Sequence, residues 1–93
     1  METVDLALYA DALASEATAV AARVERARSR LNESEIEREA RQALPRAAVE
    51  QLERLGLLRP ADEQRLYAEL RRLEADLDAL AELQAWVEAR LAE

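Results

Sequence analysis

The last third of the chain, residues 61–92, carries apolar side chains at alternating intervals of three and four residues. The members are Leu66, Leu70, Leu73, Leu77, Leu80, Val87 and Leu91, and Gln84 takes the one polar position in the series. Residues three and four apart lie on the same side of a helix, so the spacing predicts a long helix with a single apolar seam. A helix of this kind cannot bury its seam alone. The rest of the chain, or a second chain, must therefore cover it.

A second seam with the same spacing runs through the N-terminal third of the chain. It consists of Leu6, Ala10, Leu13, Ala17, Val20, Val24, Ala27 and Leu31. The regular repeat predicts a helix over about residues 3–31, capped by Thr3. We expect this helix to pack in the manner of a coiled coil against another long helix.

The middle of the chain contains signals for helix starts and ends. Ser34 and Glu37 match a capping box, which predicts that a second helix begins at residue 35. Pro45 lacks a backbone donor and disfavours helical geometry in the residue before it. Residues 35–55 therefore form either one helix kinked at Pro45 or two helices, 35–43 and 45–55. Gly56 predicts a helix end, and Pro60 predicts the first turn of a last helix over residues 60–92.

The distribution of charge favours one arrangement of these helices. Residues 1–22 carry four acids and no base, and residues 74–93 carry six acids and one base, so a simple hairpin would gather a net charge of −9 at one end. An up-down-up arrangement would place arginines beside these acids, and short connections suit antiparallel neighbours. We therefore predict an all-α fold, an antiparallel, coiled-coil-like three-helix bundle that forms one domain over residues 1–93.

Missing residue types exclude most kinds of chemistry. The chain has no Cys, His or Lys and only one Gly, so it lacks the usual nucleophile and base pairs, metal ligands and phosphate-binding loops. We expect no enzyme activity, cofactor, metal or small-molecule ligand. The net charge of −7 disfavours nucleic acid and anionic membranes as partners. No apolar run approaches the roughly 20 residues that span a bilayer, and a signal-peptide pattern is lacking, so we expect a cytoplasmic location.

Two groups of residues point to a protein partner. The side of helix 3–31 opposite its seam is also apolar, and a helix that is apolar nearly all round is usually buried all round. Its candidate partner-binding residues are Val4, Leu8, Tyr9 and Ala12, although the alanines on this side also raise helix propensity. Leu83 and Trp86 form the second candidate surface, unless Trp86 is buried at the end of the bundle. We expect a homodimer or a different protein to cover these residues.

Residues 36–67 resemble the helix-turn-helix and the start of the wing in MerR-type regulators. The matching residues are Ile36, Ala40-Arg41, Val49, Leu52 to Pro60, and Arg65-Leu66-Tyr67. The resemblance implies a DNA-reading helix and a dimerisation helix over residues 61–92. The turn is one residue short and lacks the usual glycine, and Glu50 and Gln51 replace basic and aromatic residues. These departures imply a relative that has lost DNA contact and kept a protein-binding role.

These observations favour a small interaction protein without catalytic activity. It would act as an adaptor, a chaperone-like assembly factor or an inhibitor by docking on a partner. A transcriptional regulator that uses residues 35–67 is the alternative. An acidic inhibitor encoded by a phage or plasmid also fits the size and charge, although arginines between the acids interrupt its negative surface.

Overall fold

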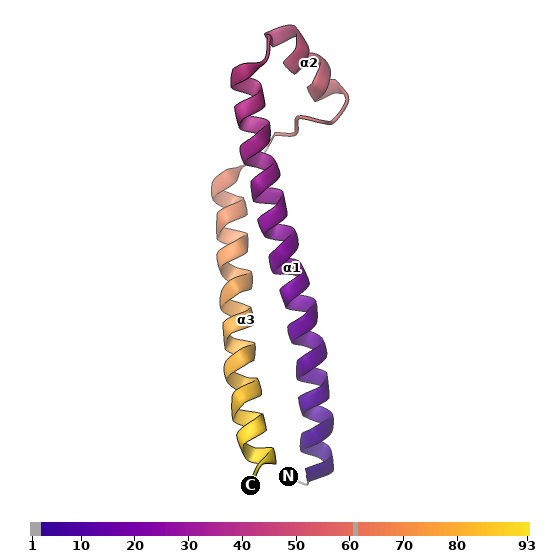
Figure 1. Ribbon diagram of the computed structural model, residues 1–93, viewed down its shortest axis with the longest axis vertical. Helices are drawn as coiled ribbons and strands as arrows, with labels where there is room; N and C mark the ends of the chain where they lie inside the picture. The colour runs from indigo at the N-terminus through magenta and orange to yellow at the C-terminus, as the bar shows by residue number, and fades with distance from the viewer. Residues whose placement is uncertain (1–2, 61) are drawn as a thin grey trace.

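The computed structural model describes the backbone of residues 3–60 and 62–93 and the side chains of residues 5–60 and 62–93. Within these ranges the chain forms three helices and no strand: α1 (Thr3–Ala43), α2 (Arg46–Arg54) and α3 (Glu63–Leu91). Helices α1 and α3 lie antiparallel along a rod of 66 × 20 × 15 Å, and α2 folds over at the end of the rod remote from both termini (Figure 1). The predicted all-α fold is confirmed.

Both predicted seams form the contact between α1 and α3. The buried apolar side chains of α1 are the seam residues Leu6, Leu13, Val20, Val24 and Leu31, and those of α3 are Leu73 and Val87. Val87 and Val24 are the least exposed, at 1% and 2%. The other apolar seam residues of α3 are only half-buried. Two helices cannot enclose a seam completely, because each helix covers only one side of the other.

Helix α1 continues through the predicted break at residues 32–34 and ends at Ala43. The predicted capping box of Ser34 and Glu37, and the helix start at residue 35, are therefore wrong. None of residues 32–34 is Gly or Pro, and Asn and Ser in a helix cost only up to about 0.7 kcal/mol each. The seam spacing also continues from Leu31 to Ser34, which is buried with 4% exposure. Packing against the rest of the chain keeps this segment helical.

Pro45 separates two helices, as in the second interpretation of the sequence, but residues 35–43 are the end of α1 and not a separate helix. Helix α1 ends two residues before Pro45, and the Pro45 carbonyl accepts a hydrogen bond from the Val49 N–H (3.1 Å) to begin α2. Nine residues remain in α2, and none of them is buried. At about 1.5 Å per residue this helix is too short to run along the rod.

The all-α class is as predicted, but the up-down-up order is not: α1 and α3 pack antiparallel as a two-helix hairpin, and the short α2 lies at its tip (Figure 1). Both acidic ends, residues 5–22 and 74–93, lie at the same end of the rod (Figure 1). The sequence prediction had treated this arrangement as unfavourable. Exposed charges contribute at most about 1 kcal/mol per pair, whereas each buried seam leucine or valine contributes about 1.5–3 kcal/mol. Burial of the seam therefore outweighs the repulsion.

Gly56 ends α2 as predicted. Its φ angle is +75°, its N–H donates to the Glu53 carbonyl (3.0 Å), and the Leu57 N–H donates to the Leu52 carbonyl (3.0 Å). This pair of hydrogen bonds is the Schellman motif, which requires a left-handed residue after the helix. Helix α3 begins later than predicted: Pro60 precedes it, and the Asp62 carboxylate caps it by accepting from the Arg65 N–H (3.2 Å).

The substitution Gly56→Ala is expected to destabilise the protein by about 1–2 kcal/mol, because a Cβ atom strains the left-handed conformation. No atom lies within 4 Å of that Cβ position, so the loss reports backbone strain rather than a clash. Urea unfolding measures it. Gly56→Asn should recover part of the loss, since Asn adopts left-handed geometry more readily. Equal stability of the alanine variant and the wild type would contradict the assignment.

Candidate protein-interaction surfaces

The predicted partner-binding residues of α1 are exposed near its N-terminal end. Leu8 is 64% exposed, Tyr9 is 44% exposed, and Ala12 is also exposed. Leu8 follows buried Leu6 by two residues, about 200° around the helix, so it points away from α3. The side chain of Val4 lies outside the described residues. This face of α1 thus presents a large apolar side chain that the hairpin does not cover.

The predicted residues of α3 lie at the same end of the rod. Trp86 is 55% exposed rather than buried at the end of a bundle, and the Arg90 guanidinium lies 5.2 Å from the centre of its ring. Leu83 is half-buried and packs against the core cluster of Leu6, Leu13 and Val87. The structure therefore brings Leu83 into contact with α1, while Leu8 and Trp86 stay on different sides of the hairpin.

Gln84, the polar residue of the α3 seam, is half-buried rather than directed into solvent. It lines a shallow groove between the two long helices together with Ala10, Ala14 and Glu88. Small side chains on α1 leave space beside the seam at this level. A polar residue within an otherwise apolar seam can fix register at a cost in stability.

Four large apolar side chains are exposed at the other end of the rod, around α2. Ile36, Leu44, Leu55 and Leu57 are 58%, 41%, 62% and 61% exposed. We call these residues the tip patch. None of these four residues was among the partner-binding residues predicted from the sequence. The sequence signal for their exposure is the short distance between Pro45 and Gly56, because a helix that fits between these two residues is too short to bury the four side chains.

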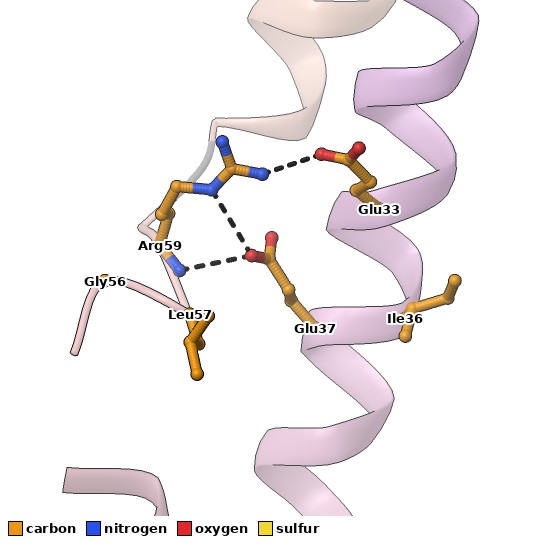
Figure 2. A pocket seen from close by; sticks show the side chains of 6 residues that line it. All are labelled: Glu33, Ile36, Glu37, Gly56, Leu57 and Arg59. Carbon is orange, nitrogen blue, oxygen red and sulfur yellow. Dashed lines mark hydrogen bonds and ion pairs between the residues drawn. The ribbon is translucent and has the colours of Figure 1, made fainter. Parts of the chain in front are cut away.

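A salt-bridged network holds the chain after α2 against α1. Figure 2 shows Glu33 and Glu37 pointing from α1 toward Arg59. The Arg59 guanidinium donates to Glu33 (2.7 Å) and Glu37 (3.5 Å), and the Arg59 backbone N–H also donates to Glu37 (3.3 Å). Arg30 donates to the second oxygen of Glu37 (3.2 Å). The carboxylate of Glu37 thus joins α1 to the segment that leads toward α3.

Glu37 is a charged side chain with only 7% exposure. Burial disfavours its ionised form, but hydrogen bonds from the Arg59 backbone and from the Arg30 and Arg59 side chains outweigh that effect and lower its pKa. In the same network the bond to Glu33 raises the pKa of Arg59. Next to it, the hydrogen bond from the Tyr67 hydroxyl to Glu35 (3.2 Å) raises the pKa of Tyr67. These shifts in pKa keep Glu37 and Arg59 charged and Tyr67 neutral near neutral pH.

The network borders a hollow of about 350 Å³, lined by the apolar side chains of Ile36 and Leu57 and by Gly56, Glu33, Glu37 and Arg59 (Figure 2). Its polar side chains already bond to one another, and its apolar side chains face solvent. A hollow of this composition fits an apolar side chain of another protein better than a small charged ligand.

Helix α2 corresponds to the DNA-reading helix of the MerR-type resemblance. It carries Arg46 and Arg54 together with Glu50 and Glu53, and Arg46 pairs with Glu50 (3.4 Å). Acids therefore balance the bases on this helix. Phosphate contacts reward a net positive surface, which α2 does not present.

Comparison of the chain with models of known protein families, with curated proteins and with solved structures found no match. The resemblance to MerR-type regulators therefore rests on the residues quoted for it alone. Of the helices that the structure describes, none combines the length and apolar character needed to cross a membrane. Among the described side chains, no group of three or more carboxylates is placed to hold a metal ion.

Proposed function

We propose that this protein is a small cytoplasmic helical docking protein without catalytic activity. The observation that carries the proposal is the tip patch, four large apolar side chains that the fold holds in solvent. Arg59, Glu33 and Glu37 fix the chain beside the patch, so these side chains do not depend on a partner for their position. Exposed apolar clusters rimmed by polar residues are typical of protein-binding sites.

The exposed area supports the same conclusion. The hairpin exposes 6984 Å². A compact protein of this mass exposes about 5,400 Å², so the excess is roughly 1,500 Å². Stable interfaces bury about 1,200–2,000 Å² in total, shared between two partners. The uncovered surface is therefore large enough for docking.

The shape of the molecule favours the role of an adaptor among the docking functions considered. The tip patch lies at one end of the 66 Å rod, and Leu8, Tyr9 and Trp86 lie toward the other end. Two separate apolar surfaces on a stiff rod can engage two partners, or a partner and a second copy of the chain. An assembly factor or inhibitor would need only one of these surfaces.

The double substitution Leu55→Glu with Leu57→Glu tests the role of the tip patch. The purified protein is immobilised through an added C-terminal tag and should retain a stoichiometric partner from an extract of the source cells. The double variant should retain at least about tenfold less of that partner, because central apolar anchors are lost. The matched control is Ala47→Glu with Gln51→Glu, which adds the same charge to exposed positions of α2. Equal retention by the double variant, or no stoichiometric partner for the wild type, would contradict the proposal.

DNA binding by the alternative regulator has a distinct signature. A regulator that reads DNA through α2 would bind DNA more weakly as salt rises, and Arg46→Glu would abolish that binding. We expect no salt-dependent binding of the wild type in a fluorescence anisotropy titration. Binding that Arg46→Glu removes would replace the docking proposal.

A further inference from the structure

The two flanks of the α1–α3 seam differ in what they carry. On one flank the hairpin closes on itself, because Arg28 pairs with Glu74 (3.2 Å) and Tyr67 donates to Glu35. Each of these residues directly follows a seam position. Residues that directly precede every second seam position, beginning with Ala10 in α1 and Leu70 in α3, lie on the opposite flank of an antiparallel pair. In α1 these are Tyr9, Glu16, Arg23 and Arg30, and in α3 they are Glu69, Asp76, Leu83 and Arg90. We call these eight residues the charged flank.

Half of the residues along the charged flank are placed so that two antiparallel copies pair them by charge, while Tyr9 then lies opposite Arg30 and Asp76 opposite Leu83. In α1, Glu16 precedes Arg23 by seven residues. If a two-fold axis at the level of residues 19–20 relates two antiparallel copies, Glu16 of each copy lies opposite Arg23 of the other. In α3, Glu69 and Arg90 are related in the same way about residues 79–80. Leu13 and Val87 pack together. Because the two helices are antiparallel, Val20, seven residues after Leu13, lies level with Leu80, seven residues before Val87. One two-fold axis therefore satisfies both helices.

Glu16 and Arg23 are available for such a contact, whereas Arg30 is bonded to Glu37 and Glu69 to Arg72. Glu16, Arg23 and Asp76 have no ion-pair partner among the side chains that the structure describes. More broadly, the half of the rod that contains the termini is strongly acidic, and residues 23–72 carry ten acids and twelve bases. A parallel pair would place two acidic ends together. An antiparallel pair places each acidic end beside the slightly basic half of the other copy.

Apolar side chains on this flank and in the adjoining seam add to the contact. Tyr9 is 44% exposed near one end of the flank, and Leu83 beside the seam and Leu80 within it are both half-buried. A second hairpin laid on this flank would turn an incompletely covered two-helix seam into a four-helix core, as antiparallel bundles do. Leu8 points away from α3 and from this contact.

We propose that two copies of the chain pair antiparallel through the charged flank, with Glu16 of each copy bonded to Arg23 of the other. The two-fold symmetry makes every contact occur twice, so a single substitution changes two pairs. The inference rests on the proposed docking function and names a second copy as the occupant of Tyr9 and Leu83, two of the predicted partner-binding residues. The tip patch stays free for a different protein.

Charge reversal with rescue tests this pairing. Glu16→Arg and Arg23→Glu should each weaken the dimer at least about tenfold, because each replaces two attractive pairs with two repulsive ones. The double variant Glu16→Arg with Arg23→Glu should restore the wild-type dissociation constant. Both residues are exposed, so circular dichroism should show folded helices in all three variants. Glu88→Arg, on the other flank, makes the same change in net charge as Glu16→Arg and should leave dimerisation unchanged.

Sedimentation equilibrium at moderate salt measures each dissociation constant. A wild type that is monomeric at every concentration, single reversals without effect, or a double variant as weak as the singles would overturn the inference. None of these results bears on capture of a partner by the tip patch. Failure of that capture, with the rescue intact, would overturn the docking of a different protein and leave the dimer standing.

Discussion

Val24→Asp is expected to abolish the folded hairpin. Val24 is 2% exposed at the middle of the seam, where α3 covers it and a carboxylate would lose most of its hydration. A charge buried without a partner costs several kcal/mol, and this fold has only one seam to hold it together. The total stability of small domains is about 5–15 kcal/mol, and a two-helix hairpin lies toward the lower end. We therefore expect loss of most of the helical circular dichroism signal at 25 °C and no cooperative thermal transition.

The matched control for this substitution is Ala22→Asp. Ala22 lies two residues away in the same helix, is exposed, and receives the same new charge. It should retain a cooperative transition and lose only a few tenths of a kcal/mol of helix propensity. If Val24→Asp melted like this control, the seam would not carry the stability of the molecule.

Glu37→Gln is expected to lower the free energy of unfolding by about 1–3 kcal/mol, the second large effect. The amide keeps the size of the side chain but removes the charge that accepts bonds from Arg30 and from the side chain and backbone of Arg59. Urea unfolding at pH 7 measures the loss. Glu39→Gln removes an exposed carboxylate two residues along α1 and should change stability by less than about 0.5 kcal/mol.

The same substitution predicts a change in pH dependence. The pKa of Glu37 is lower in the folded protein than its ordinary value of 4.5. Its contribution to stability is therefore present above that value and is lost as pH falls through the lower folded-state pKa. Glu37→Gln should flatten this acid limb of the stability curve. An unchanged limb would show that the network around Arg59 does not depend on the Glu37 charge.

Periodicity predicted the part of the fold that repeated contacts determine. Every α1 residue of the first seam is buried or half-buried, because a three-and-four spacing over eight positions fits no other arrangement than a long helix against a neighbour. The interruption at residues 32–34 was misread because a capping signal is local. Ser34 also occupies the next seam position. Tertiary packing favoured a continuous helix with Ser34 in the seam over a new helix start at Ser34.

The tip could not be predicted from local pattern. Ile36 and Leu44 have the spacing of a core face, but whether a core exists there depends on where the next helix passes. Ending α1 at Ala43 left too few residues for a middle helix, so these side chains stayed exposed. The role of Glu37 was hidden for a similar reason, since its partner Arg59 lies 22 residues away and is brought close only by the turn at Gly56.

The distribution of charge did not predict how the helices are arranged. The separation of acids from arginines argued for an intramolecular bundle, and the hairpin leaves that separation unsatisfied. Long-range charge complementarity is weak for each pair but acts over a Debye length of about 10 Å, so it can be met between molecules as well as within one. In the antiparallel pair that we propose, the same pattern selects orientation.

The mass of the wild-type protein in solution across a concentration series tests most directly whether the hairpin stands alone. Sedimentation equilibrium should give a mass near twice 10.5 kDa in the micromolar range and a fall toward 10.5 kDa on dilution. A mass of 10.5 kDa at every concentration up to the millimolar range would contradict a second copy as the cover for the exposed flank.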